Sequence, residues 1–362
     1  MRFLMRKRTV FLLLVLVLAI PFFSCGSSSS SSSHISYLTV PQSNHVIGLQ
    51  IDDTSGKLTG ISGSPFTAGA SPSGIAVTPA KQFAYVANSS ENDISLFTIN
   101  SGNGSLSEVT PRVNAGTNPV ALATDPGGKF LFVANQASDD VSVFSITGNG
   151  KLSEVPGSPF RVGSGPTQLL VTPSGKFLYV ANTNSSSLSA FTIAPDTGFL
   201  TGVPGSPYLL SQAPFGLAVD PAEHFLYAAL SAGFTGFAID PVAGGLKEIT
   251  VTPFTAGTSP ISLVVHPSGT FLYVANVGSN NVSVFMLDPA TGQPTPITNS
   301  PFAAGTRPAF VAIDPSGGFV FTGNQGSKNI SVFKVDSTTG GLGGSATLFP
   351  TENATAAMVI PK

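Results

Sequence analysis

Four side chains are the strongest candidates for chemistry in this sequence: His45, Arg112, Arg161 and Arg307. Imidazole is the most common general base in proteins, and guanidinium groups hold anions or a developing oxyanion through several N–H donors. A base with cations beside it would suit the hydrolysis of an ester-like bond or the binding of a phosphate. The three arginines would equally fit solvated loops, because exposed arginines are the norm.

Other polar residues have a structural explanation that we favour over a functional one. A set of asparagines recurs at one point of an internal repeat and could form a ring of ligand-binding amides, but asparagine also bonds neighbouring backbone at turns. An acidic group could hold calcium, but its spacing matches no EF-hand loop, and we expect no metal or cofactor. The asparagines are Asn88, Asn135, Asn182, Asn276 and Asn324, and the acidic residues are Glu91, Asp93, Asp139 and Asp140.

We also favour a structural role for two further histidines, His266 and His224. His266 stands in a recurring turn where other copies of the repeat have Asp125, Asp220 and Asp314, and His224 lies in the same kind of turn. The sequence contains no Gly-x-Ser-x-Gly elbow, no His-Glu-x-x-His, no P-loop and no dinucleotide-binding fingerprint.

The elements that must position these residues come from one repeat. An aromatic residue in phrases such as Phe-Leu-Tyr-Val-Ala-Asn recurs every 46–48 residues. So regular a period is typical of a solenoid or a propeller. The seven aromatic positions are Tyr37, Tyr85, Phe132, Tyr179, Tyr227, Tyr273 and Phe321.

Each copy is predicted to hold four short strands, A to D. In the third copy these are Pro119–Thr124, Phe130–Ala134, Val141–Ile146 and Leu152–Val155, separated by Gly-, Pro- and Asn-rich turns. Strands B and C are apolar with little alternation, which suits sheets buried on both faces. The fifth copy lacks the asparagine after strand B and has a B–C loop two residues shorter. The first copy, Tyr37-Leu-Thr-Val40, also lacks it.

The two ends of the repeat region complete one copy between them. The first copy has strands B, C and D from Ile35 onward, and Ala354–Pro361 repeats the pattern of strand A. Joining them would remove exposed strand edges. The sequence therefore predicts an all-β, seven-bladed propeller of four-stranded antiparallel blades, closed by the C-terminal strand.

Composition excludes several classes of protein. Only 9% of the 362 residues are charged, and the formal net charge is −2, which argues against a nucleic-acid-binding surface. A single cysteine excludes a disulfide framework within this chain.

The first residues resemble an export signal. Arg2, Arg6, Lys7 and Arg8 precede an apolar run from Val10 to Phe23, which is too short to span a bilayer. Cys25 then stands as in a bacterial lipobox, and seven serines follow Gly26. We expect a signal peptide (1–24), a lipidated Cys25 with a serine-rich tether (25–34) and a propeller (35–362). Plain secretion is the alternative to a lipid anchor in the cell envelope.

The repeat resembles known propellers. Tyr85–Asn88, Tyr179–Asn182 and Tyr273–Asn276 read Tyr-Val-Ala-Asn, which resembles the Tyr-Val-Thr-Asn repeat. The wider unit resembles the lactonase family of seven-bladed propellers, which includes bacterial 6-phosphogluconolactonase. The resemblance implies that D–A and B–C loops form the ligand-binding face, with His or Arg near several strand A starts. The matching positions are Gly74, Ala121, Gln168, Gly216, Ser262 and Phe310, and the one fitting residue is Arg307, just before Pro308.

Three hypotheses of function follow, one with chemistry and two without. The resemblance implies hydrolysis of a lactone at the channel mouth, with Arg307, Arg112, Arg161 and His45 as candidate site residues. The missing channel histidines favour the alternative, a non-catalytic, surface-anchored binding or scaffold propeller for protein or carbohydrate partners, or a component of an envelope assembly. In each case we expect a monomer that meets the membrane only through its lipid.

Overall fold

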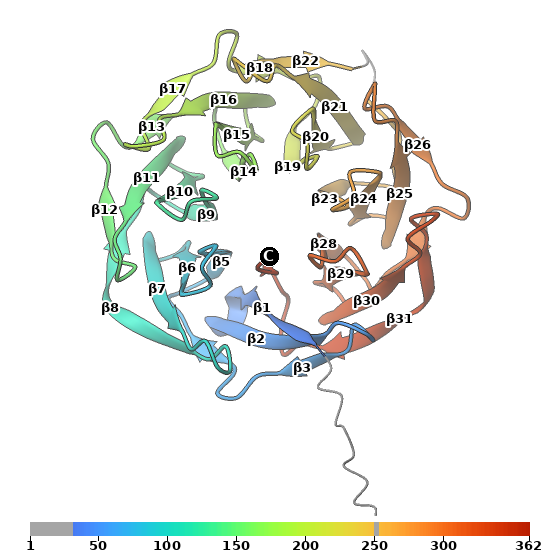
Figure 1. The fold of residues 1–362 in the computed structure, drawn as a ribbon, viewed down its shortest axis with the longest axis horizontal. Helices are drawn as coiled ribbons and strands as arrows, with labels where there is room; N and C mark the ends of the chain where they lie inside the picture. Colours follow the sequence, from blue (N-terminus) through green and yellow to red (C-terminus); the bar gives the residue numbers. More distant parts are fainter. Residues whose placement is uncertain (1–31, 250–252) are drawn as a thin grey trace, which may run out of the picture. The chain divides into compact units, whose positions relative to one another are not determined.

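The computed structural model describes residues 32–249 and 253–362, which form a ring of seven antiparallel sheets, the blades (Figure 1). The predicted seven-bladed propeller is confirmed. One short 3-10 helix, η1 (Pro41–Ser43), interrupts the strands of this part, and no helix in it is long and apolar enough to cross a membrane. The predicted signal peptide and Cys25 lie outside the described residues. The first strand starts at Ser33, two residues before the predicted boundary.

Each blade runs from strand A at the centre to strand D at the rim. The A strands are β5 (Pro72–Val77), β9 (Pro119–Thr124), β14 (Pro166–Val171), β19 (Pro214–Val219), β23 (Pro260–Val265), β28 (Pro308–Ile313) and β32 (Met358–Val359). The B strands are β1 (Ser33–Val40), β6 (Phe83–Asn88), β10 (Phe130–Asn135), β15 (Phe177–Asn182), β20 (Phe225–Leu230), β24 (Phe271–Asn276) and β29 (Phe319–Asn324).

The outer half of each blade is less regular. The C strands are β2 (His45–Asp52), β7 (Asp93–Ile99), β11 (Asp140–Ile146), β16 (Ser187–Ile193), β21 (Gly233–Ile239), β25 (Asn281–Leu287) and β30 (Asn329–Val335). The D strands are β3 (Leu58–Gly60), β8 (Leu106–Asn114), β12 (Leu152–Glu154), β17 (Leu200–Gly202), β22 (Leu246–Glu248), β26 (Pro294–Pro296) and β31 (Leu342–Pro350). In four blades a two-residue strand follows strand D and also pairs with strand C: β4 (Phe66–Thr67), β13 (Phe160–Arg161), β18 (Tyr208–Leu209) and β27 (Phe302–Ala303).

The ring closes as predicted. Blade 1 combines β32 with β1, β2 and β3, and blades 2 to 7 follow in chain order. Tyr37 pairs with Val359 and Leu38 with Met358, and the Thr39 N–H donates to the Ala357 carbonyl at 3.0 Å. The closing strand has two residues, so it is much shorter than the predicted Ala354–Pro361.

Polar side chains shape the turns between strands. In the A–B turn of blade 3, Asp125 Oδ1 accepts the N–H groups of Lys129 and Phe130 at 2.7 and 2.6 Å. At the C–D turn of blade 7, Asp336 Oδ1 accepts two backbone N–H groups, and Gly340 adopts a φ of +73° that favours glycine. These turns emerge on one side of the ring, which we call the turn face, and the B–C and D–A loops emerge on the other, the loop face.

The apolar core lies between neighbouring blades. Seven clusters of buried side chains each combine residues of two adjacent sheets, so every blade is stabilised by both neighbours. Buried tyrosines add a polar link: the Tyr37 hydroxyl donates to the Gly104 carbonyl of blade 2 at 2.6 Å, and the Tyr85 hydroxyl to that of Gly150 in blade 3 at 2.7 Å. Tyr179, Tyr227 and Tyr273 repeat this bond in later blades.

Candidate functional site

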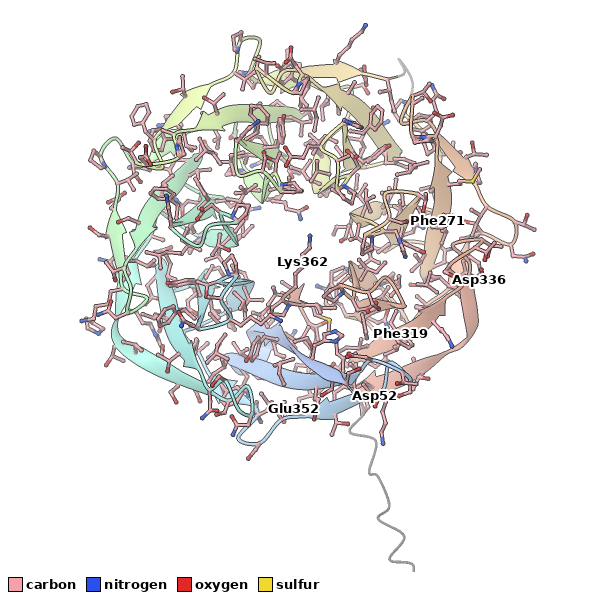
Figure 2. The ribbon with its side chains drawn as sticks, in the orientation of Figure 1. Asp52, Phe271, Phe319, Asp336, Glu352 and Lys362 are labelled. Carbon is pink, nitrogen blue, oxygen red and sulfur yellow. The ribbon has the colours of Figure 1, made fainter. Side chains whose placement is uncertain are left out.

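The centre of the ring contains two cavities bounded by the A strands. The cavity nearer the loop face has a volume of about 570 Å³, and its lining includes Ile75, Leu122, Leu169, Phe215, Leu263 and Val311. Within the described residues its wall carries no Asp, Glu, His, Lys or Arg. The cavity nearer the turn face, about 680 Å³, is lined by two carboxylates, Asp125 and Asp314, and by Lys362, which projects toward the middle of the ring (Figure 2).

The polar side chains of the loop-face cavity already bond the ring itself. The Ser73 hydroxyl donates to the Pro119 carbonyl of the next blade at 2.9 Å. Gln168 Oε1 accepts the Leu217 N–H at 2.6 Å, and Ser262 Oγ accepts the Val311 N–H at 3.1 Å. Because these groups join neighbouring A strands, the free surface of this cavity is mainly aliphatic.

Two of the predicted arginines are far from the channel wall in the fold. The sequence places both in D–A loops. Arg112 instead lies in strand D, in β8, whereas Arg161 does lie in the D–A connection, in the two-residue strand β13 that pairs with strand C. Arg112 forms ion pairs with Glu91 and Glu108, both at 2.7 Å. The hydrogen bond that its guanidinium donates to the Glu108 carboxylate raises the pKa of Arg112. The Arg161 guanidinium donates to the Ser138 carbonyl at 3.0 Å.

Arg307 does lie in a D–A loop on the loop face. Its φ is +56°, and its N–H donates to Asn280 Oδ1 of blade 6 at 2.8 Å, which holds the backbone in place. The side chain is exposed, and its guanidinium makes no hydrogen bond or ion pair to residues 32–249 or 253–362. Arg307 is therefore a cation on the loop face, next to the start of strand A in blade 7, that makes no such contact.

The repeated asparagines are structural, but not as predicted. Each is buried, and its Nδ2 donates to side chains on strand C rather than to the loop backbone. Asn135 Nδ2, for example, donates to Asp140 Oδ1 at 2.7 Å and to Ser142 Oγ at 2.9 Å. In the other blades, side chains at the same two positions of strand C accept hydrogen bonds from Nδ2 of Asn88, Asn182, Asn276 and Asn324.

His45 is the exception in this pattern. It occupies the strand C position of Asp140, but Val40 replaces the asparagine that would bond it. Its Nδ1 is buried and has no hydrogen-bond partner among the described residues, and it lies 3.9 Å from Glu352 Oε2. The side chain is 30% exposed, so part of the ring meets solvent. The missing asparagine thus leaves an imidazole beside a carboxylate without a structural hydrogen bond.

Glu352 was not among the predicted site residues. It lies in the D–A connection from β31 to β32, at the seam between blades 7 and 1 (Figure 2). Hydrogen bonds join this segment to both sides: Asn353 Nδ2 donates to Ser43 Oγ at 2.7 Å, and Gln325 Nε2 to the Thr355 carbonyl at 3.5 Å. One substitution visible in the sequence, Val40 in place of the recurring asparagine, could have pointed to this seam.

The loops link Arg307 to the same sector. The Gln325 N–H donates to the Arg307 carbonyl at 2.9 Å, and the Thr351 N–H to that of Lys328 at 2.9 Å. Arg307, Lys328, Glu352 and His45 therefore lie along one continuous stretch of the loop face, the seam sector.

The other candidates contribute nothing to this sector. His266 is buried and bonds Ser268 Oγ and the Gly317 carbonyl, and His224 is exposed in an A–B turn on the turn face. The acidic candidates accept hydrogen bonds within the fold: Glu91 from Arg112, Asp93 from Asn88, Asp139 from the Gly165 N–H and Asp140 from Asn135. In the part of the chain that the structure describes, no three carboxylate, imidazole or thiol side chains come together to hold a metal ion.

Solved structures share this architecture. A candidate 6-phosphogluconolactonase from Bacteroides fragilis is 20% identical, with a TM-score of 0.81 over 92% of this chain and 99% of that one. The periplasmic gluconolactonase of Pseudomonas aeruginosa is 20% identical, with a TM-score of 0.77 over 91% and 99%. Hydrazine synthase of Kuenenia stuttgartiensis is 17% identical, with a TM-score of 0.64 over 83% and 94%. At these identities the likeness concerns the fold.

A family model settles the relationship. No curated protein matches this chain. The model of the seven-bladed β-propeller lactonases, however, matches residues 28–164, 150–259 and 230–359, which together cover nearly the whole ring. The repeat phrases, the closed ring of seven blades and this match lead to one conclusion: the chain belongs to the lactonase family of seven-bladed β-propellers.

Proposed function

We propose that this propeller hydrolyses a lactone on its loop face, at the seam sector. The observation that carries the proposal is His45, whose Nδ1 faces Glu352 at 3.9 Å and is free of the bond that this strand position makes in five other blades. A base next to a carboxylate that orients it is the usual arrangement for activating a nucleophile. Such contacts are often long before substrate binds.

Each residue then has a defined role. With Nδ1–H directed at Glu352, His45 Nε2 accepts a proton from water as the water oxygen attacks the lactone carbonyl carbon. Glu352 is a positioning residue that also stabilises the imidazolium. The Arg307 guanidinium neutralises the oxyanion, and the proton on His45 passes to the ring oxygen as its bond to the carbonyl carbon breaks. The product is the open hydroxy acid.

The place of action is part of the same proposal. The chain would be exported and anchored through a lipid on Cys25, where it meets extracytoplasmic lactones. The N-terminal pattern supports this, as does the word periplasmic in the name of the Pseudomonas protein. Metabolic labelling with a radioactive fatty acid should mark the parent and not Cys25→Ser, whereas an unlabelled parent would favour plain secretion.

A hydrolysis screen with gluconolactone, 6-phosphogluconolactone and acyl-homoserine lactones tests the activity. We expect His45→Gln to lower kcat/KM by about 10²–10⁴-fold, as for loss of a general base. Glu352→Gln should have a smaller effect, mainly on kcat. Arg112→Ala and His224→Gln serve as matched controls, since the first arginine is ion-paired and the second histidine lies on the turn face. Turnover that His45→Gln leaves unchanged would refute the assignment.

A second function has its own supporting observation. The loop-face cavity is lined mainly by aliphatic groups, and its polar side chains bond the ring. That surface suits the holding of a neutral, partly apolar ligand without chemistry. Calorimetry with the same lactones separates the two: binding without turnover, unaffected by His45→Gln, would assign the protein to the non-catalytic, surface-anchored class with a small-molecule, carbohydrate or protein partner.

A further inference from the structure

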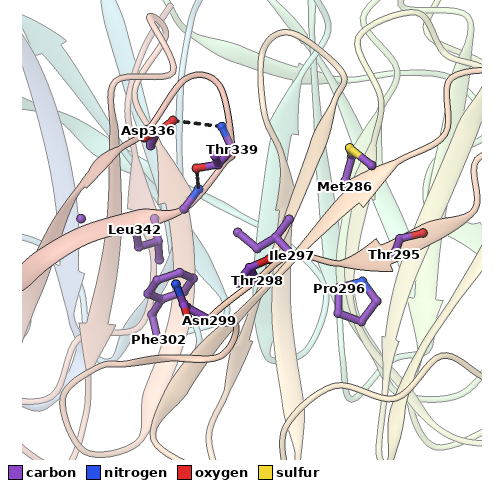
Figure 3. Close-up of a pocket in the computed structure, with 12 residues that line it drawn as sticks. Met286, Thr295, Pro296, Ile297, Thr298, Asn299, Phe302, Asp336, Thr339 and Leu342 are labelled. Atoms are coloured by element: carbon purple, nitrogen blue, oxygen red, sulfur yellow. Dashed lines mark hydrogen bonds between the residues drawn. The ribbon is translucent and has the colours of Figure 1, made fainter.

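A groove on the outer wall lies between blades 6 and 7 (Figure 3). Its volume is about 500 Å³, and one side is formed by β25 to β27 and the other by the C–D turn and β31 of blade 7. Met286, which borders it, is 53% exposed although it is a large apolar side chain. The other apolar walls are Pro296, Ile297, Phe302 and Leu342.

Between blades 3 and 4 the chain fills the equivalent place with its own side chain. Phe199, after the C–D turn glycine of blade 4, contacts Phe160 edge to face, with ring centres 5.1 Å apart and planes at 84°. In the repeat, Phe302 corresponds to Phe160 as the first residue of its short strand. Gly341 corresponds to Phe199, since each follows a C–D turn glycine and precedes a buried leucine. Blades 6 and 7 therefore keep one ring of the pair and lack the other.

The junction of blades 4 and 5 shows a different solution. There Tyr208 takes the place of Phe160, and Gly245 that of Phe199. The Tyr208 hydroxyl donates to the Pro204 carbonyl at 3.1 Å and accepts the Leu246 N–H at 3.2 Å, which bridges the two blades. Phe302 has no hydroxyl and leaves its junction open.

The open groove also carries a negative charge. Asp336 lines it, and its Oδ1 accepts the N–H groups of Thr338 and Thr339 at 2.9 Å. The two N–H groups lower the pKa of Asp336, so the carboxylate is ionised at neutral pH. Asn299 adds a hydrogen-bonding amide where blade 3 has Gly157.

We propose that this groove binds an aromatic side chain of a partner protein, carried beside a basic residue. The ring takes the place that Phe199 fills between blades 3 and 4, edge to face with Phe302, and the basic group lies near Asp336. An edge-to-face pair contributes about 0.5–1.5 kcal/mol beyond the burial of apolar area.

Benzylammonium chloride is the probe, because it joins one aromatic ring to one cation. Saturation-transfer NMR on the full chain should show its ring protons bound, with a Kd of about 1 mM for so few atoms. Cyclohexylmethylammonium, which has the charge without the aromatic ring, should bind about 2–10-fold more weakly. A parent chain that gives no transfer to benzylammonium, or equal transfer to both amines, overturns the proposal.

Two substitutions that exchange residues between the equivalent positions 199 and 341 test where the probe binds. Gly341→Phe should fill the groove and abolish binding. A Cβ there lies 3.8 Å from the Phe302 ring and 3.2 Å from the Thr339 hydroxyl. Phe199→Gly opens the equivalent place between blades 3 and 4, but Ala194 stands there in the position of Asp336, so we expect no second site of equal affinity. If Gly341→Phe unfolds, Asn299→Gly/Gly341→Phe reproduces the Gly157 and Phe199 combination. Benzylammonium binding that persists in the folded Gly341→Phe variant, or a second site of equal affinity in Phe199→Gly, contradicts the proposal.

Discussion

Tyr37 allows a direct test of how adjacent blades are held together. Its hydroxyl is buried between blades 1 and 2 and donates to the Gly104 carbonyl at 2.6 Å. Burial raises the pKa of Tyr37 to about 12, whereas an unfolded tyrosine titrates near 10. Because the unfolded chain releases this proton first, the stabilisation is complete below pH 10 and is lost as the pH rises from 10 to 12.

The expected size follows from these values. Two pH units at about 1.4 kcal/mol each give a loss of up to about 3 kcal/mol from this one group. At pH 8, Tyr37→Phe leaves the Gly104 carbonyl without its donor, which costs about 1–3 kcal/mol. The variant should therefore be less stable than the parent at pH 8, and the difference should shrink toward pH 12.

Urea unfolding of both chains at intervals from pH 8 to pH 12 measures this difference. Lysines and the other tyrosines titrate equally in both, so they cancel in the comparison. Phe321→Tyr is the reciprocal control, because blade 7 has phenylalanine at the position equivalent to Tyr37. In this variant the free energy of unfolding should fall more steeply between pH 10 and pH 12 than in the parent. Parallel loss of stability in the parent and Tyr37→Phe would refute the assignment of a buried, hydrogen-bonded hydroxyl.

Three further changes test other parts of the ring. Asn135→Asp should destabilise the fold by about 3 kcal/mol or more in urea unfolding, because it places a second carboxylate against Asp140 in a buried site. Arg112→Ala should cost about 0.2–1 kcal/mol by the same measurement and leave any hydrolysis unchanged, since its two ion pairs are partly solvated. Val359→Asp should lower the melting temperature sharply, because it places a carboxylate against the apolar cluster of blades 1 and 2 on which Val359 packs; an unchanged melting curve would contradict ring closure by β32.

The strands and the closure could be predicted because they follow from local patterns. In the third copy, the strand predicted at Pro119–Thr124 is β9, and the other three differ from β10, β11 and β12 by one residue. Turn residues and apolar runs act over a few positions and recur seven times, so each copy supports the others.

The site could be predicted only in part, because it depends on contacts between distant segments. The repeat pattern places His45 on the ligand-binding face, but its contact with Glu352 exists only once the ring is closed. Ser43 and Asn353, which form a hydrogen bond beside this pair, are 310 residues apart in the sequence. Arg112 was misplaced because an exposed edge strand and a polar loop have the same composition. The groove between blades 6 and 7 could not be predicted either, because it exists only where Gly341 replaces the aromatic ring that Phe199 supplies at another junction.

The two-residue strand β32 imposes an order on the synthesis of the molecule. The blade that contains Tyr37 is the first to be started and the last to be completed, since its innermost strand contains Val359. A growing chain therefore presents the free edge of β1 until almost the whole ring has been made. An unpaired edge of this kind is where a nascent chain meets other strands, including those of another copy. Chains truncated before β32 should therefore associate, whereas a chain that includes β32 covers the edge of β1.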